Sequence, residues 1–175
     1  MPATAIRSAT AQDLPQILAI YNDVVATSTA IYTTAPSTLD ERRKWFDARI
    51  AAGYPVIVAE RDGQVAGFAS FGEFRGAWPG YLYSVEHSVH VARDHRGHGV
   101  GRALVAALFP LAAALDKHVI IGGIDATNTA SLALHQSLGF ERVAHFREVG
   151  RKFGTWLDLV FMQRFIDDAG AVRPE

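Results

Sequence analysis

The sequence predicts a mixed α/β fold in which part of the sheet is antiparallel. Apolar residues recur at helical spacing in several segments, and shorter apolar segments between them are typical of strands. Two of these strands flank Asp62-Gly63, which predicts a hairpin turn. At 175 residues the chain is long enough for one well-filled core, so we expect one domain over residues 1–166 and a C-terminal tail over residues 167–175.

A short strand and two helices are predicted at the N-terminal end. The strand covers residues 5–9, and each helix follows a Thr that stands three residues before a carboxylate, the spacing of a capping box. The pairs are Thr10 with Asp13 and Thr38 with Glu41. We expect the second helix to bury its apolar residues and to end near Gly53. These residues are Leu39, Trp45, Phe46 and Ile50.

A hairpin and a glycine-rich loop follow. The hairpin covers residues 56–71, and residues 72–80 predict a loop that also carries Arg75 and Trp78. From there on strands and helices alternate. The remaining predicted elements are a strand over residues 82–91, a helix to about residue 115, a strand over residues 119–124, a helix over residues 128–138 and strands over residues 140–146 and 156–162.

Composition narrows the classes of function. A formal net charge of -1 gives no electrostatic reason to expect nucleic acid or a membrane surface as a partner. The chain has no cysteine, which excludes disulfides, thiolate metal sites and a cysteine nucleophile. No apolar run has the length of a membrane span and the first residues lack the apolar core of a signal peptide, so we expect a cytoplasmic protein.

The junction between the strand over residues 82–91 and the next helix predicts an anion site. Gly97, Gly99 and Gly101 allow positive φ angles and expose backbone N–H groups, and the helix that starts there directs its dipole to the same point. Arg96 and Arg102 add positive charge. A phosphate or pyrophosphate fits this pattern, although a tight turn that only needs flexible residues is the alternative. The histidines nearby follow no recognised metal-ligand spacing, so we expect no metal.

The spacing excludes two common phosphate motifs. A dinucleotide fingerprint would need glycine where Arg102 stands, and the Walker pattern is absent. The motif Arg-x-x-Gly-x-Gly at residues 96–101 resembles the GNAT superfamily of acetyl-CoA-dependent N-acetyltransferases, as does the segment from Asn128 to Phe140 with its Asn-x-x-Ser start and Gly-Phe end. The resemblance implies a central, mostly antiparallel, splayed six- to seven-stranded sheet flanked by about four helices.

Closer similarity points to one branch of that superfamily. Residues 85–91 and 152–159 resemble the phosphinothricin and methionine sulfoximine acetyltransferases, and this likeness extends from Ile6 to Met162. It implies transfer of acetyl to the α-amine of a small amino acid or analogue by direct attack in a ternary complex, and a homodimer. It also implies a set of residues that contact acetyl-CoA. They are Ser88, Val89, His90, Val91, Arg96, Gly97, His98, Gly99, Val100, Gly101, Asn128 and Ser131.

Two residues are candidates for proton transfer. Glu86 is a carboxylate in an otherwise apolar strand, so burial could raise its pKa into the range of a useful base, directly or through a water; the alternative is a solvated outward residue. His87 points to the opposite face unless a bulge reverses it. His135 occupies a helix position where many superfamily members carry a tyrosine acid, and a hydrogen-bonded core histidine is the equal alternative. Asn128 is either an N-cap or a ligand of pantetheine.

An α-amino-acid substrate brings a carboxylate, for which Arg75 is the candidate clamp; the alternative is a solvated loop arginine. Lys152 could add positive charge from the loop before the last strand. The full predicted substrate set is Arg75, Gly76, Ala77, Val85, Glu86, His87 and Lys152. Rival functions are acetylation of a protein N-terminus, a polyamine or an aminoglycoside, and a non-catalytic acyl-CoA sensor, which would tolerate the loss of Glu86.

Overall fold

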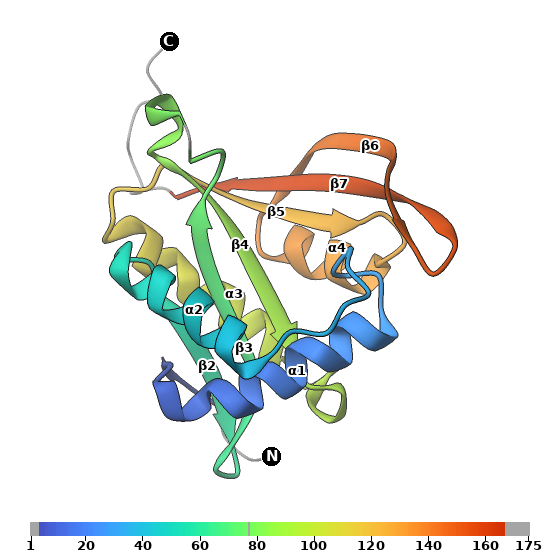
Figure 1. Cartoon of the computed structure of the whole chain (residues 1–175). Coiled ribbons are helices and arrows are strands. Elements are labelled where there is room, and N and C mark those ends of the chain that lie inside the picture. The colour runs from blue at the N-terminus through green and yellow to red at the C-terminus, as the bar shows by residue number, and fades with distance from the viewer. Residues whose placement is uncertain (1–3, 77, 167–175) are drawn as a thin grey trace.

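The structure is a computed structural model that describes residues 4–76 and 78–166. Ala77 and the predicted tail, residues 167–175, lie outside the described residues. Figure 1 shows a twisted sheet with α1 and α2 in front of its strands and α3 behind them. No helix in the described ranges is long and apolar enough to cross a membrane.

The sheet has seven strands in the order β1-β2-β3-β4-β5-β7-β6. All neighbours are antiparallel except β4 and β5, which are parallel. The predicted turn at Asp62-Gly63 is confirmed, because both residues have positive φ and join β2 to β3. The strands are β1 (Ala5–Ser8), β2 (Val56–Arg61), β3 (Gln64–Glu73), β4 (Ser84–Val91), β5 (Val119–Asp125), β6 (Glu141–Lys152) and β7 (Thr155–Phe165).

Four α-helices cover the two faces of the sheet. They are α1 (Leu14–Thr27), α2 (Leu39–Ala51), α3 (Val100–Ala113) and α4 (Thr129–Ser137). Both predicted capping boxes are present, at Thr10 with Asp13 and at Thr38 with Glu41. Alternation along β2 divides the core, because Val58 packs on the side of α1 and Ala59 on the side of α3. The mixed fold with a mostly antiparallel sheet and four helices is therefore confirmed.

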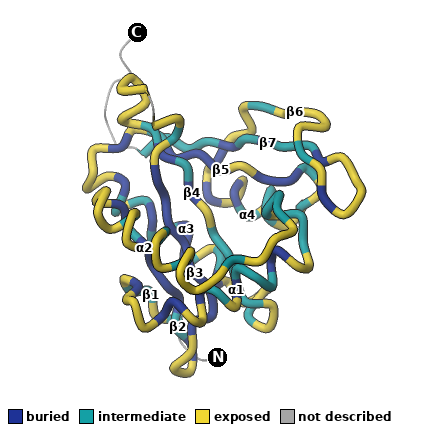
Figure 2. Tube along the Cα trace, viewed as in Figure 1, coloured by how far each residue is buried: buried dark blue, intermediate teal, exposed yellow. Residues whose placement is uncertain are grey.

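The prediction that α2 buries all its apolar residues is wrong. Leu39 is 39% exposed and Ile50 is 51% exposed, and no residue of α2 is buried. The inner face follows the spacing i, i+3, i+4, i+7, which here places two arginines beside two aromatic residues. They are Arg42, Trp45, Phe46 and Arg49, all half-buried. Figure 2 shows the contrast between this largely exposed helix and the buried central strands.

The sheet opens between β4 and β5. The parallel pairing joins Ser84 through His87 to Val119 through Gly122 and stops there, whereas β4 remains paired with β3 as far as Val91. The possible bulge in β4 is not found, since the pairing between Val85–Val91 and β3 runs without a register shift. Strand separation alone therefore produces the splay, and it leaves the second half of β4 with an open edge.

Candidate active site

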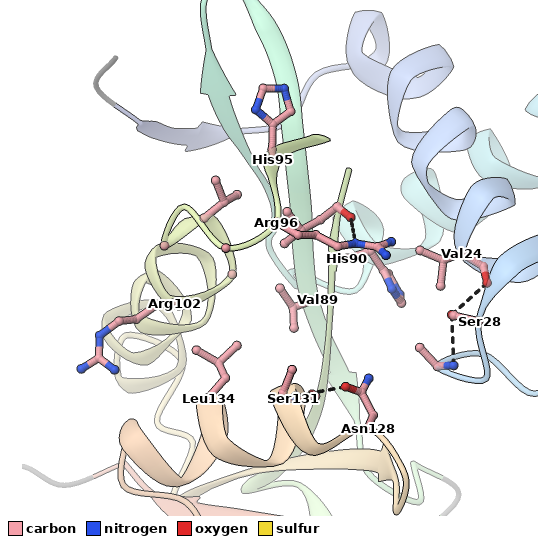
Figure 3. Close-up of a pocket in the computed structure, with 17 residues that line it drawn as sticks. Val24, Ser28, Val89, His90, His95, Arg96, Arg102, Asn128, Ser131 and Leu134 are labelled. Carbon is pink, nitrogen blue, oxygen red and sulfur yellow. Dashed lines mark hydrogen bonds between the residues drawn. The ribbon is translucent and has the colours of Figure 1, made fainter. Parts of the chain in front are cut away.

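A cavity of about 550 Å³ lies at the open edge of β4. Its walls come from α1, β4, the glycine junction and α4, as Figure 3 shows. A second cavity of about 270 Å³ adjoins it and shares Val89, His90, Asn128 and Ser131 as lining residues. Glu86, His87 and His135 line this smaller cavity. The structure thus brings the predicted cofactor residues and the predicted proton-transfer residues to one connected cleft.

The glycine junction has the backbone geometry of an anion site. Gly97 has φ of 76° and Gly99 has φ of 79°, and a Cβ atom at either position would meet no atom within 4 Å. Positive φ, rather than close packing, therefore explains why both are glycine. Gly99 is the N-cap residue of α3 and no side chain caps this helix, so the N–H groups of its first turn face the cavity mouth.

The two arginines of the junction differ in direction. Arg96 lines the cavity, where its Nε donates to Val91 O at 3.1 Å and its Nη2 lies 3.8 Å from Asp23 Oδ2. Arg102 is turned toward α4 and donates to Ser137 Oγ at 2.7 Å.

Nearly all the predicted cofactor residues line the larger cavity. Ser88 instead lines the smaller cavity, and His98 lines neither of the two.

Backbone alternation in β4 exposes particular amide groups. Ala92 N donates to Ala66 O and Phe74 N donates to Ser84 O, so the even-numbered residues of β4 bond to β3. The N–H and C=O of Val89 and Val91 consequently point to the open edge, where Val91 O already accepts from Arg96. Among residues 89–91, Val89 and Val91 therefore offer main-chain groups to the cleft, whereas the N–H and C=O of His90 face β3.

Asn128 has the N-cap role that the sequence left open, and its side chain also lines the cavity. Its Oδ1 accepts a hydrogen bond from Ser131 N at 3.1 Å, which makes it the N-cap of α4. Its side-chain nitrogen faces the cavity (Figure 3). The cap fixes the side chain through Oδ1 and leaves the amide N–H₂ at the cavity wall.

Glu86 lies half-buried on the face of β4 that looks toward α1 and α2. Its Oε1 lies above β5, where a Cβ atom added at Gly123 would be 3.2 Å from it. Burial raises the pKa of the Glu86 carboxyl above its ordinary value, and the positive charge of Arg49 opposes this rise. A carboxylate with a raised pKa is a better proton acceptor than an ordinary one.

His87 and His135 form a stacked pair on the opposite face. Their Nε2 atoms are 3.2 Å apart, and His135 Nδ1 lies 2.7 Å from Ser131 O. Because a carbonyl only accepts, His135 Nδ1 carries the proton, its Nε2 accepts, and His87 Nε2 donates. Burial lowers the pKa of His87 to about 3 and also lowers that of His135, so both rings are neutral at neutral pH. Both nitrogens of His135 are therefore engaged within the protein.

Of the predicted substrate residues that the structure describes, only Glu86 and His87 line this cleft. Val85 is fully buried in the core. The Arg75 guanidinium lies 5.3 Å from the centre of the Tyr81 ring, and Arg75 lines neither part of the cleft. Gly76 lines a separate cavity of about 370 Å³. Ala77 is outside the described residues, so the substrate role of this loop stays a prediction.

Lys152 differs from its expected position. It is the last residue of β6 rather than a loop residue, and its side chain is buried. Its Nζ donates to Val25 O, Ser28 O and Ile31 O, each at 2.7 Å. All three N–H bonds of the ammonium are used, so this charge holds the segment after α1 and does not face a substrate.

Sequence reasoning missed Arg49 and the pairing of the two histidines. Arg49 belongs to a helix whose local pattern carries no sign of chemistry, although glycine at position 72 signals a close approach to the backbone. The described residues contain no group of three His, Asp or Glu side chains that could hold a metal ion.

Comparisons with known proteins agree on one family. The sequence pattern of the acetyltransferase (GNAT) family matches residues 17–140. An L-methionine sulfoximine/L-methionine sulfone acetyltransferase from Pseudomonas paraeruginosa is 48% identical over 94% of this chain and 96% of its own. The crystal structure of a ribosomal-protein-alanine N-acetyltransferase from Brucella melitensis is 50% identical, with a TM-score of 0.90, over 92% of this chain and 99% of its own. A GNAT phosphinothricin acetyltransferase from Sinorhizobium meliloti, solved with acetyl-CoA, is 35% identical over 98% of this chain and 93% of its own, with a TM-score of 0.92.

Proposed function

The chain belongs to the GNAT family of acetyl-CoA-dependent N-acetyltransferases, and on that premise we propose that its acceptor is the α-amine of a small amino acid or analogue. Methionine sulfoximine, methionine sulfone and phosphinothricin represent this acceptor class. The names of the relatives from Pseudomonas paraeruginosa and Sinorhizobium meliloti support this choice. The observation that carries the proposal is the position of Glu86. It is a half-buried carboxylate in the smaller cavity of the cleft, and the glycine junction lines the larger one.

The cleft fits the parts of acetyl-CoA, which supplies an acetyl group as a thioester. The N–H groups at the start of α3 and the charge of Arg96 suit the pyrophosphate. The outward N–H and C=O groups of Val89 and Val91 suit the amides of the pantetheine arm, and Asn128 offers an N–H₂ group from the opposite wall. In this arrangement the Val89 N–H would donate to the thioester oxygen and so stabilise the charge that develops there.

Glu86 is the proposed general base. A protonated amine cannot attack a carbonyl, so the acceptor must lose a proton as its nitrogen forms the new C–N bond and the C–S bond breaks. The carboxylate of Glu86 accepts that proton, directly or through one water. Its raised pKa favours this role, because a base works best when its pKa lies near the working pH.

The proton for the departing thiolate has a less direct source. His135 is the proposed acid, but its Nε2 already accepts from His87 and its Nδ1 donates to Ser131 O. Proton delivery from His135 would therefore require the ring to break one of these bonds. The geometry supports a positioning role for the pair more directly than a role as acid.

A protein N-terminus is the second candidate acceptor. It is favoured by the 50% identity to the structure from Brucella melitensis that is described as a ribosomal-protein-alanine N-acetyltransferase. Such an acceptor also presents an α-amine, but it lacks the adjacent carboxylate. Acceptors with and without this carboxylate therefore distinguish the two candidates.

The test is release of CoA thiol from acetyl-CoA by the purified protein with a panel of amines. The panel contains methionine sulfoximine, methionine sulfone, phosphinothricin, ordinary amino acids, spermidine and a peptide with N-terminal alanine. Saturable turnover on the first three is expected. Turnover on the peptide alone would favour the second candidate, and cofactor binding without any turnover would favour an acyl-CoA sensor.

A homodimer is the proposed assembly. Support comes from apolar side chains that remain exposed on the β6-β7 hairpin, because exposed apolar surface often marks an interface. They are Val143, Phe146, Val149, Phe153 and Trp156. Light scattering on the purified protein would show twice the chain mass of 19.0 kDa if the proposal holds, and the chain mass if it does not.

A further inference from the structure

The guanidinium of Arg49 is a half-buried cation without a hydrogen-bond or ion-pair partner among residues 4–76 and 78–166. It projects from the inner face of α2 onto the backbone of Gly72, where a Cβ atom would overlap it. Its Nε is buried without a hydrogen bond, and no hydrogen bond or ion pair within the described residues engages its other nitrogens. Burying an unpaired charge is costly, so a position that retains one is a candidate for binding an anionic ligand.

Arg49 and Glu86 lie on the same face of the sheet. Gly72 and Glu86 are directly paired across β3 and β4, and paired residues in an antiparallel sheet direct their side chains to the same side. The guanidinium stands over β3 at Gly72, whereas the Glu86 carboxylate leans over β5 at Gly123. The cation and the carboxylate therefore flank β4, with one strand between them.

The cavity beside Arg49 belongs to the region where the sequence predicts substrate. It measures about 370 Å³, and Gly76 of the predicted substrate loop lines it together with Trp45 and Tyr54 of the α2 side. Glu73 also lines it, but no ion pair forms between Glu73 and Arg49. An anion that enters this cavity would meet an arginine whose donors are not engaged.

We propose that Arg49 binds the carboxylate of the acceptor amino acid while the acceptor amine lies at Glu86. The inference rests on the proposed function, because only an α-amino acid brings a carboxylate next to the reacting amine. The length of an α-amino acid matches the distance between the two side chains. Neighbouring strands are about 4.8 Å apart, so β3 and β5 are separated by about 10 Å, and an α-amino acid with one hydrogen bond at each end spans about 9 Å.

In this placement, binding of the acceptor carboxylate at Arg49 would change the pKa of Glu86. Arg49 opposes the rise in the pKa of Glu86, while Tyr54, Glu73 and Glu86 are the titratable groups whose charges act on Arg49. A bound carboxylate would neutralise Arg49 and so remove that opposition. Glu86 becomes a stronger base only when the acceptor carries the carboxylate, which favours amino acids over simple amines beyond binding alone.

The test compares two acceptors that differ only in the carboxylate. They are methionine sulfone and its decarboxylated counterpart, 3-(methylsulfonyl)propylamine. At a pH above the acidic limb of the pH profile, Arg49→Gln should lower kcat/KM for methionine sulfone by about 10- to 100-fold and leave the value for the amine within about twofold, as expected for loss of a charged hydrogen-bonded pair. Arg49→Lys should retain part of the preference.

Arg42→Gln is the matched control, because Arg42 is also a half-buried arginine of the inner face of α2 with an unpaired Nε. It should not change the ratio of the two kcat/KM values. Acetyl-CoA binding measured by calorimetry confirms that each variant is folded, and Arg49→Lys replaces Arg49→Gln if the latter is not.

Two results would overturn the role of Arg49 alone. One is a carboxylate preference that survives in Arg49→Gln, as an equal loss on both acceptors would show. The other is the same change of ratio in Arg42→Gln. If the wild-type protein shows no preference for the carboxylate-bearing acceptor, the proposed acceptor class fails and the role of Arg49 fails with it.

Discussion

Lys152 is a buried cation and Arg49 is a half-buried one, and they differ in their hydrogen-bond partners. Lys152 Nζ donates to three backbone carbonyls of the segment after α1, each at 2.7 Å. Arg49 has no hydrogen-bond partner among the described residues. A cation whose donors are all used holds the fold, whereas one with unused donors is available to a ligand.

The same distinction separates other polar groups of the cleft. Tyr32 donates its hydroxyl to Asp158 O at 3.0 Å and so fastens the same segment as Lys152 to β7. The first N–H groups of α3 have no side-chain cap. Loss of a satisfied group should therefore lower stability, and loss of an unsatisfied one should lower ligand binding.

The largest effect is expected for Lys152→Met, which takes the Nζ donor from three backbone carbonyls, one buried and two half-buried. The free energy of unfolding should fall by about 3 to 5 kcal/mol, measured by urea denaturation. Arg151→Met is the control, because Arg151 is an exposed neighbour that only approaches the Trp156 ring, and its effect should be about 0.5 kcal/mol or less. Equal free energies of unfolding in the two variants would show that the hydrogen bonds of Lys152 do not stabilise the fold.

Gly99→Val tests the unsatisfied N–H groups. A β-branched residue at φ of 79° is strained by about 1 to 3 kcal/mol, so the junction should rearrange and acetyl-CoA should bind about tenfold or more weakly by calorimetry. Gly80→Val is the control, because a Cβ atom there meets nothing within 4 Å and the φ angle of Gly80 is not positive. Unchanged affinity in Gly99→Val would remove the pyrophosphate assignment.

Tyr32→Phe should have a smaller effect on stability. It removes one hydroxyl from one carbonyl, and the free energy of unfolding should fall by about 1 kcal/mol. Because residues 30 and 31 line the cleft, the KM for the acceptor should rise more than the KM for acetyl-CoA. A rise confined to acetyl-CoA would show that this segment does not shape the acceptor site.

Arg49→Met should shift a pH profile rather than stability. Arg49 lowers the pKa of Glu86, so its removal lets burial raise that pKa further. The acidic limb of kcat/KM should therefore move to higher pH for every acceptor, because less of the enzyme carries ionised Glu86 at a given pH. A limb that does not move would show that Arg49 does not act on Glu86.

Local patterns explain why much of the cleft was predictable from sequence. Gly97 and Gly99 are required by their own φ angles, and Asn128 caps the helix that starts next to it. Each of these signals depends on residues that are close in the chain. The same holds for the two capping boxes and for the turn at Asp62-Gly63.

Contacts between distant segments explain what the sequence did not reveal. Lys152 bonds carbonyls more than 120 residues away, and His87 meets His135 across 48 residues. Which face of α2 turns inward depends on the sheet below it, so the exposure of Ile50 and the position of Arg49 could not be derived from periodicity alone. Gly72, beside Arg49, and Gly123, beside Glu86, can be read from the sequence. Only the register of β3, β4 and β5 shows that these glycines leave room for the two side chains on one face of the sheet.

The most direct measurement is the pH dependence of acetyl transfer to methionine sulfone by the wild-type protein and by Glu86→Gln. The wild-type kcat/KM should rise with pH along a limb that lies above the range of an ordinary carboxyl, since burial raises the pKa of Glu86. In Glu86→Gln that limb should disappear and turnover near neutral pH should fall by about 10²- to 10⁴-fold, with unchanged affinity for CoA. Equal activity of the two proteins at every pH would contradict the role of Glu86 as the base.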